Sequence, residues 1–427
     1  MSSEHQHQGP ALVAGAPRQV AVVGAGTVGL ATAWFLQEAG VRVTVYERDH
    51  VGAGASWGNA DRLTPALTAP LPEPAVLRYG LRAVLSPRSP VYLPLRADRT
   101  LLRFLTGFVA HSTARRWRRG VAAYAPLNER ALEAFDVLAA GGVPATTHRA
   151  ETFLACFRRE RDAAGLLAEL GQVRDGGQQA ASHPVTGWRV RAIEPVLTDR
   201  VGAAVQLHGQ RYLHPPEFVA GLARAVRDRG GAVVEGGDVT DLRSGPDGVV
   251  VTTRSGDRQR HDAVVLATGA WLGELASRFG VRQPVQAGRG YSFSVPVERM
   301  PAGPLYFPAQ RVALTPLGDR LRVAGMMEFR RPGDPLDPRR VTAVADAVRP
   351  FLTGVDLDDR RDEWVGSRPC TPDGLPLVGA TASPRVFVAG GHGMWGIVLG
   401  PLTGQLLAQT VLKGEAPPEL APFDPLR

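Results

Sequence analysis

The sequence predicts an α/β protein in which a Rossmann-type domain is interrupted by the chain of a second domain. Three observations predict this fold: a glycine-rich turn between a strand and a helix near the N-terminus, strands of the same character much later in the chain, and a length of 427 residues. A chain of this length exceeds the size at which a single hydrophobic core keeps growing, so two domains are expected.

The N-terminal unit consists of two short strands joined by a glycine-rich turn and a helix. The β-branched run of residues 20–23 leads into Gly-Ala-Gly-Thr-Val-Gly at residues 24–29, which opens a helical stretch. A second strand, residues 41–46, ends at Glu47. A glycine fingerprint in this position, with an acidic residue about 20 residues further on, is typical of a site for an adenine dinucleotide.

Each residue of this fingerprint has a physical role. Gly24 allows the tight turn, Gly26 lets the backbone approach a pyrophosphate, and Gly29 lets the helix pack on the strand. The helix N-terminus offers unpaired N–H groups to the phosphates. A carboxylate at the end of the second strand accepts hydrogen bonds from a ribose diol. The cofactor contacts expected in this unit are those of Gly24, Gly26, Thr27, Val28, Gly29, Glu47 and Arg48.

The composition is that of a globular protein, with 44% hydrophobic and 21% charged residues and no apolar run long enough to span a membrane. The first 17 residues lack the pattern of a signal peptide and are expected to form a disordered extension. Two cysteines, Cys156 and Cys370, make no disulfide framework, which fits the cytoplasm. No metal site is expected.

The formal charge of +8 comes almost entirely from arginines that are scattered among carboxylates. The one dense cluster, Arg-Arg-Trp-Arg-Arg at residues 115–119, is interpreted as a solvated helix face. Peripheral contact with the anionic inner face of a membrane is the alternative, and nucleic-acid binding is not expected.

Pieces of a dinucleotide-binding domain lie at both ends and in the middle of the chain. The strand of residues 263–267 runs into a second glycine turn, and the strand of residues 386–388 runs into a glycine-rich loop and a final apolar helix. FAD proteins commonly have such an interrupted domain, whereas NAD dehydrogenases usually keep theirs in one piece. The insertions are expected to build a second, α+β domain with a largely antiparallel sheet, which binds the substrate. The expected boundaries are residues 18–85, 196–280 and 362–427 for the FAD-binding domain and residues 86–195 and 281–361 for the substrate domain.

Three further segments carry side chains or glycines suited to a flavin. Residues 52–60 supply small residues and hydroxyl or amide donors, residues 364–379 place an arginine before a turn rich in proline and glycine, and residues 390–397 open the last helix. The further cofactor contacts expected from these segments and from the middle of the chain are those of Ser56, Asn59, Ala60, Val239, Thr268, Gly269, Trp271, Gly391, Gly393, Met394, Trp395, Gly396 and Ile397.

Together these segments resemble the D-amino-acid oxidase superfamily of FAD enzymes, and within it the bacterial D-amino-acid dehydrogenases. The family's pattern after the acidic residue is Gly-Ala-Ser, then Asn-Ala-Gly, then Ser-Pro; here it reads GASWGNADRLTP, with Asp61 in place of the usual glycine. Residues 290–292 and 320–328 are also similar to the dehydrogenase subgroup. The resemblance covers roughly residues 18–427. It implies non-covalent FAD, because Cys370 is too close to the following Pro-Asp pair to match the cysteine that holds FAD in sarcosine-type relatives.

Three residues are candidates for contact with the substrate. The guanidinium of Arg368 suits a planar carboxylate, and the family's carboxylate-binding arginine has the same Gly-x-Arg-Pro setting; the alternative is an ion pair with Asp373. His392 either holds the flavin segment through its backbone or turns its side chain to the substrate. Tyr291 either offers a hydroxyl to the substrate or is an aromatic of the strand core.

The reaction that this resemblance implies is oxidation of the C–N bond of a D-amino acid or of a cyclic or secondary amino acid. Hydride passes to the flavin, and the imine hydrolyses to a 2-oxo acid. The electron acceptor is a quinone or dye, or else oxygen. The alternatives are an oxygen-using amine oxidase of the glycine or sarcosine type, a biosynthetic oxidase of a modified amino acid, and a binding protein in which FAD is structural.

Overall fold

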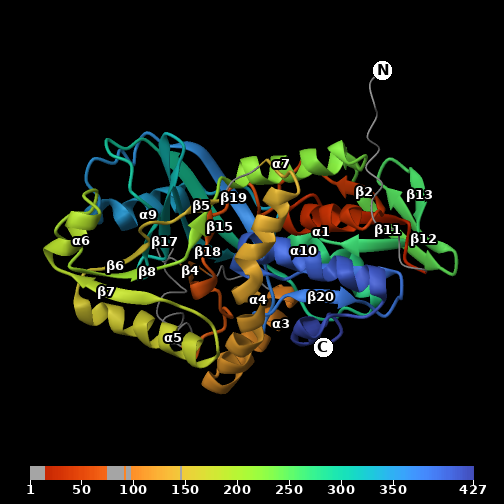
Figure 1. Cartoon of the computed structure of the whole chain (residues 1–427), viewed down its shortest axis with the longest axis horizontal. Coiled ribbons are helices and arrows are strands. Elements are labelled where there is room, and N and C mark those ends of the chain that lie inside the picture. The colour runs from red at the N-terminus through yellow and green to blue at the C-terminus, as the bar shows by residue number, and fades with distance from the viewer. Residues whose placement is uncertain (1–14, 75–90, 93–97, 145–146) are drawn as a thin grey trace.

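The computed structural model describes residues 15–74, 91–92, 98–144 and 147–427. The expected N-terminal extension therefore lies mostly outside the described residues. The molecule is elongated: α1 and α10 cover a sheet at one end, and α5, α6 and α9 lie at the other (Figure 1). The described strands form four sheets, with six, nine, three and three strands.

The six-stranded sheet forms the core of the first domain. Its order is β10-β2-β1-β14-β21-β20, and all neighbours are parallel except the pair β20–β21. The strands are β1 (Gln19–Val23), β2 (Arg42–Glu47), β10 (Ala232–Glu235), β14 (Ala263–Leu266), β20 (Leu377–Ala380) and β21 (Val386–Gly390). The pieces come from both ends and the middle of the chain, so the expected discontinuous α/β domain is confirmed.

Both faces of this sheet are buried, which explains why β1 is apolar from Val20 to Val23. Val20 and Val22 face a layer of helices, while Ala21 and Val23 pack against the small sheet and helix on the opposite face. The first layer consists of α1 (Thr27–Glu38), α4 (Ala114–Ala140), α7 (Pro215–Asp228) and α10 (Gly396–Lys413). The second consists of α8 (Leu272–Ala276) and the strands β11 (Val239–Gly245), β12 (Gly248–Thr253) and β13 (Arg258–His261).

The last helix is long and strongly apolar. With the turn before it, residues 393–413, it is long and apolar enough to cross a membrane, but 72% of its apolar window is buried inside the protein. Helix α10 packs along α1, where the position of Gly404 brings the backbones into contact: a Cβ there would lie 2.6 Å from the N atom of Thr32. Its hydrophobicity is therefore that of a core helix.

The nine-stranded sheet forms the core of the second domain and is mostly antiparallel. Its order is β19-β15-β18-β17-β16-β6-β8-β7, with β4 added beside β18. The strands are β4 (Val91–Tyr92), β6 (Leu154–Phe157), β7 (Ser182–Thr186), β8 (Ala203–Leu207), β15 (Gln286–Val295), β16 (Leu305–Phe307), β17 (Val312–Leu317), β18 (Arg320–Phe329) and β19 (Arg361–Cys370). Helix α9 (Pro338–Val348) packs on one face, and α3 (Arg99–His111) contacts β15 and packs with β18 on the other.

The remaining described elements lie around these two sheets. A small sheet of β3 (Arg62–Leu63), β5 (His148–Arg149) and β9 (Arg211–Tyr212) borders both domains. The helices α5 (Ala164–Asp175) and α6 (Trp188–Ile193) cover the outer end of the second domain (Figure 1).

Two strands differ from the expected domain boundaries. Strand β8 pairs with β6, and β19 pairs with β15, so residues 203–207 and 361–370 belong to the sheet of the second domain. Their short apolar patterns do not indicate which of two sheets they join, because that choice depends on distant partners. The consequence is that β19 carries Arg368 out of the second domain to the boundary with the first.

Candidate functional site

Two cavities meet between the domains. One has a volume of about 430 Å³ and lies at the carboxyl ends of β1, β2, β14 and β21; the other, of about 910 Å³, lies between α3 and the second sheet. Among the described residues, only Asn59 and Arg368 line both cavities. In an open parallel sheet, ligands bind outside the carboxyl ends of the strands, as the first cavity does here.

Most of the expected cofactor residues gather in the first cavity. Its walls include Gly24, Gly26, Thr27, Val28, Glu47, Arg48, Ser56, Asn59, Val239, Thr268, Gly269, Trp271, Gly393, Gly396 and Ile397. Ala60, Met394 and Trp395 line the second cavity instead, whereas Gly29 and Gly391 line neither. Gly29 is required for packing behind the cavity wall, because a Cβ at this position would collide with the carbonyl oxygen of Gly24.

The glycine turn is shaped for a close approach from the cavity side. Gly24 has φ +111°, a conformation that residues with a Cβ rarely adopt. Ser56 is bound to the turn, because its Oγ accepts a hydrogen bond from the N–H of Thr27 at 3.1 Å. Helix α1 begins at Thr27 without a side-chain cap, so its first turn leaves N–H groups for a ligand. Helix α10 also begins without one and opens onto the same cavity.

The carboxylate of Glu47 is fixed by two backbone hydrogen bonds. One oxygen accepts from the N–H of Ala25 at 2.8 Å, and the other accepts from the N–H of Asp49 at 3.1 Å. A carboxylate oxygen has two lone pairs, so each retains acceptor capacity towards the cavity. Beside it, the guanidinium of Arg48 lies 4.2 Å from the centre of the Trp271 ring. This arrangement fits a ribose diol at Glu47.

Arg368 lies where the two cavities join. Its Nη1 donates a hydrogen bond to the carbonyl oxygen of Met326 at 2.8 Å. That carbonyl is presented by a β-bulge, because Met326 and Met327 together oppose the single residue Gly290 and Met326 has φ +70°. The guanidinium lies directly over Gly290, where any Cβ would collide with it. Burial lowers the pKa of Arg368 to about 10, which leaves it charged at neutral pH.

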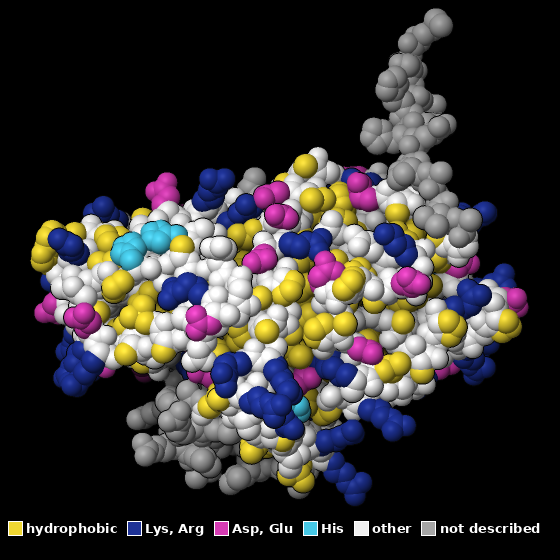
Figure 2. Space-filling model, turned by 60° about the horizontal axis from the view of Figure 1, so that its bottom comes forward, with side chains coloured by type: hydrophobic (Ala, Val, Ile, Leu, Met, Phe, Trp, Pro, Cys, Tyr) yellow, Lys and Arg dark blue, Asp and Glu magenta, His cyan; other side chains and the backbone are white. Residues whose placement is uncertain are grey.

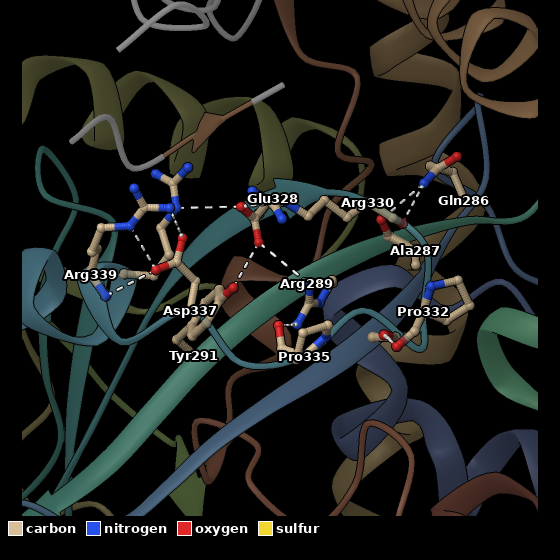
Figure 3. A network of polar contacts seen from close by, with 12 residues as sticks. Gln286, Ala287, Arg289, Tyr291, Glu328, Arg330, Pro332, Pro335, Asp337 and Arg339 are labelled. Carbon is tan, nitrogen blue, oxygen red and sulfur yellow. Dashed lines mark hydrogen bonds and ion pairs between the residues drawn. The ribbon is translucent and has the colours of Figure 1, made fainter. Parts of the chain in front are cut away.

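Tyr291 is placed away from both cavities. Its hydroxyl donates to Glu328 Oε2 at 2.7 Å in a buried network that also contains Arg289 and Arg330, as Figure 3 shows. Burial raises its pKa. The pleat explains the difference from the expected substrate contact: Tyr291 points to the face under α9, while its neighbour Ser292 points to the other face and donates to the carbonyl oxygen of Gly58. Of the two roles considered, the structure has the core aromatic.

His392 lines the first cavity, but its imidazole is committed to the protein. Its Nε2 lies 3.0 Å from the hydroxyl of Thr403 on α10, and burial lowers its pKa to about 4. The ring is therefore neutral at physiological pH and holds the loop before α10 in place. Arg368 likewise does not pair with Asp373, whose carboxylate binds the C-terminal Arg427 at 2.9 Å.

The sequence singles out Met326 and Met327 as candidates for the wall of a substrate pocket, but not the other residues of the second cavity. Its walls include apolar, aromatic and sulfur-containing side chains of α3 and β18 and three described arginines besides Arg368: Phe104, Leu105, Phe108, Met326, Met327, Phe329, Arg62, Arg158 and Arg311. These segments are far apart in the chain, and each has the pattern of an ordinary core element. Among the residues not identified, only Arg62 is marked in the sequence, because it directly follows Asp61, which replaces the family's usual glycine.

The chain is similar to FAD-dependent enzymes along most of its length. The model of the DAO family, described as FAD dependent oxidoreductase, matches residues 19–410. A D-amino acid dehydrogenase of Methylobacterium radiotolerans is 32% identical over 420 residues, covering 95% of this chain and 98% of the relative. One of Cereibacter sphaeroides is 29% identical over 406 residues, covering 93% and 92%.

Solved structures show the same fold. Glycine oxidase from Geobacillus kaustophilus superimposes with a TM-score of 0.71 at 23% identity, covering 96% of this chain and 99% of that one. L-proline dehydrogenase from P. horikoshii superimposes with a TM-score of 0.69 at 17% identity, covering 96% and 98%. The family model, which matches residues 19–410, defines an FAD-dependent oxidoreductase. The chain belongs to the DAO family, and the expected fold, cofactor and enzyme class are confirmed.

The residues of the first cavity fit FAD. Two uncapped helix N-termini face the same space, the glycine turn leaves room for a pyrophosphate, and a fixed carboxylate stands at the end of β2. The second cavity joins the first at Asn59 and Arg368, where a flavin ring would meet a substrate. FAD, when bound, supplies the acceptor for a hydride.

We expect Glu47→Gln to weaken FAD binding by about ten-fold to a hundred-fold, because a hydrogen bond to a charged group contributes about 1.5–3 kcal/mol. Fluorescence titration of the apoprotein with FAD measures the change. Glu38→Gln is the matched control, since Glu38 lies at the surface in an ion pair with Arg229. Equal FAD affinity in wild type and Glu47→Gln would remove Glu47 from the cofactor site.

Proposed function

We propose that this enzyme oxidises the C–N bond of a D-amino acid, or of a cyclic or secondary amino acid, to an imine that hydrolyses to a 2-oxo acid. The observation that carries the proposal is the position of Arg368, a half-buried cation at the junction of the two cavities with one hydrogen bond to the backbone. A guanidinium binds a planar carboxylate through two parallel hydrogen bonds. The dehydrogenase names of the relatives favour the same substrate class.

The chain's own residues bind and orient the substrate. The carboxylate at Arg368 places the amino acid's α-carbon where the cavities join, and the apolar walls of α3 and β18 exclude water from the reacting C–H bond. No side chain near Arg368 is required as a base if the amine binds neutral. Neutral His392 and the buried Tyr291 hydroxyl are each committed to a protein partner.

Anaerobic mixing with candidate substrates tests this function. We expect D-amino acids to bleach the flavin absorption, and a quinone or dye to restore it faster than oxygen does. D- and L-amino acids, glycine, sarcosine and proline make up the panel. Hydrogen peroxide formed as fast as dye is reduced would identify an oxidase. A flavin that no member of the panel reduces would contradict the proposal.

We also propose that FAD is held without a covalent bond. The thiol of Cys370 is buried, its pKa is raised by burial to about 12, and it lines neither cavity. We expect acid precipitation to release all of the flavin into the supernatant, for wild type and for Cys370→Ser alike. Yellow colour that stays in the wild-type pellet and is lost in Cys370→Ser would show a thioether link.

We propose that one surface of the enzyme contacts an anionic membrane. On α3, Leu102 is 63% exposed and Val109 is 56% exposed. The start of α4 exposes a cluster of cations: Arg115, Arg116, Arg118 and Arg119. Figure 2 shows Lys and Arg side chains gathered with hydrophobic ones at the lower edge of the molecule.

Sedimentation with lipid vesicles tests this contact. We expect binding to phosphatidylglycerol vesicles that salt weakens, since each surface arginine contributes about 1 kcal/mol and the attraction is screened. Replacing the four arginines by glutamine should abolish it. Equal binding to neutral phosphatidylcholine vesicles, or none at low salt, would contradict it.

A further inference from the structure

We propose that Arg62 is a second anion-binding side chain of the substrate cavity, which selects amino acids whose side chain ends in a carboxylate. This inference rests on the proposed oxidation of amino acids and names their class. It starts from the position of Arg62 at the beginning of β3, directly after the loop that carries Asn59 and Ala60 along the cavity wall.

Aromatic rings hold the guanidinium of Arg62 in the cavity. Its central carbon lies 4.6 Å from the centre of the Tyr306 ring and 5.8 Å from that of Phe153. Arg62 and Tyr306 both line the 910 Å³ cavity. Stacking on rings fixes a guanidinium without using its N–H groups, which remain available to an acceptor in the plane.

Two of the guanidinium nitrogens of Arg62 have no hydrogen-bond acceptor among the described residues. Nε and Nη1 of Arg62 are buried without a partner among the described residues. An unpartnered buried donor costs about 1–3 kcal/mol, and more when it is charged. Groups of this kind are usually satisfied by something that binds to them, and in a cavity this is a ligand or water.

The adjacent acid does not satisfy Arg62. Both carboxylate oxygens of Asp61 are also buried without a hydrogen-bond partner among the described residues, in a backbone conformation with φ +66°. Burial raises the pKa of Asp61 well above its usual value, against the charges of Arg322 and Arg62. A carboxyl that is more readily protonated compensates a neighbouring cation less.

Glu73 and Glu169 also line this cavity, but Arg62 is not among the charges that act on Glu169. Burial raises the pKa of Glu169 to about 7, the negative charge of Glu73 adds to the effect, and the cation that opposes it is Arg311. The charge of Arg62 acts instead on Arg368, whose pKa it helps to lower. Two guanidiniums that repel each other in one cavity are jointly stabilised by a ligand with two anionic ends.

Four described arginines line this cavity, but Arg158 lies over the Phe351 ring and Arg311 acts on Glu169, so Arg368 and Arg62 define the ligand. Arg368 binds the α-carboxylate at the junction with the cofactor cavity, and Arg62 binds a second carboxylate deeper in the substrate cavity. The ligand is therefore a dicarboxylic amino acid, for which D-glutamate serves as the probe. An amide in place of the second carboxylate has the same shape without the charge, so D-glutamine is the matched comparison for D-glutamate.

The test compares the two substrates across four proteins with dye as acceptor. We expect the wild type to have at least ten-fold higher kcat/KM for D-glutamate than for D-glutamine. Arg62→Gln should lower kcat/KM for D-glutamate about a hundred-fold and change that for D-glutamine by less than about three-fold, because only the charged end loses its partner. Arg62→Lys should recover part of the loss. Arg158→Gln is the control, since Arg158 also lines this cavity and lies over a ring, that of Phe351.

The possible results distinguish failure of the inference about Arg62 from failure of the proposed amino-acid oxidation. Equal losses for both substrates would mean that Arg62 assists Arg368 at the α-carboxylate or only supports the fold, and would overturn the inference while leaving amino-acid oxidation intact. A wild type without preference for D-glutamate would overturn it as well. If no amino acid is oxidised, the flavin spectrum still decides: glutarate should perturb it at lower concentration than pentanoate in wild type, and the difference should vanish in Arg62→Gln.

Discussion

Arg368→Met should lower kcat/KM for the best amino-acid substrate by about two to four orders of magnitude while FAD stays bound. The loss of a charge-assisted contact inside a closed cavity costs about 3–5 kcal/mol, part of which is the penalty of the carboxylate left unpaired. Each 1.36 kcal/mol corresponds to a factor of ten in rate. Steady-state kinetics with dye as acceptor measures the effect, and the flavin absorption of the purified variant checks that the cofactor site is intact.

Two controls make this result specific. Arg368→Lys should recover only part of the activity, because a point charge cannot reproduce the two-pronged geometry of a guanidinium. An amine without a carboxylate should be a poor substrate for the wild type, and the substitution should hardly change its turnover. Near-native kcat/KM in Arg368→Met would mean that the carboxylate is held elsewhere.

Glu328→Gln should be among the most destabilising substitutions in the second domain. Glu328 is fully buried and lies 2.9 Å from Arg330 Nε, 3.3 Å from Arg340 Nε and 3.8 Å from Arg289 Nη1, and it accepts the hydroxyl hydrogen of Tyr291. Figure 3 shows Arg289, Tyr291 and Arg330 around its carboxylate. Removing one partner of a buried ion pair costs about 3–5 kcal/mol, because the opposite charges remain buried.

Urea denaturation of the FAD-loaded enzyme measures this loss. Glu363→Gln is the control: Glu363 pairs with Arg360 at 3.2 Å, but the pair is partly exposed, so the change should be below about 1 kcal/mol. A midpoint for Glu328→Gln equal to that of the control would mean that the arginines find other acceptors. The network lies on β18 beside the bulge that presents the Met326 carbonyl, so a reduced affinity for substrate should accompany the lower stability.

The sequence predicts those features of the molecule whose function depends on residues that are close together in the chain. The turn from Gly24 to Gly29 joins a strand to a helix within one short segment, and its geometry requires glycine at fixed positions. The segment around Arg368 resembles the family's Gly-x-Arg-Pro segment and predicts an arginine that binds a carboxylate. Both are properties of neighbouring residues in the chain.

The parts that the sequence does not predict depend on pairing across long distances. Which way Tyr291 points depends on the register and pleat of β15, and the sheet that β8 joins depends on a partner far away in the sequence. The unpartnered state of Arg62 follows from what surrounds it, including rings contributed by residues 153 and 306. The pattern of residue types along the chain does not indicate which distant residues become neighbours in the fold.

The two cavities have almost separate walls, and this separation affects how the enzyme can change. Among the described residues, only Asn59 and Arg368 contact both spaces. Substitutions on α3 or β18, such as at Phe104, Phe108 or Phe329, would therefore reshape the chamber that accepts the side chain and leave the nucleotide wall as it is. Evolution, or a directed library confined to those positions, can explore new substrates on this scaffold without first having to rebuild its redox centre.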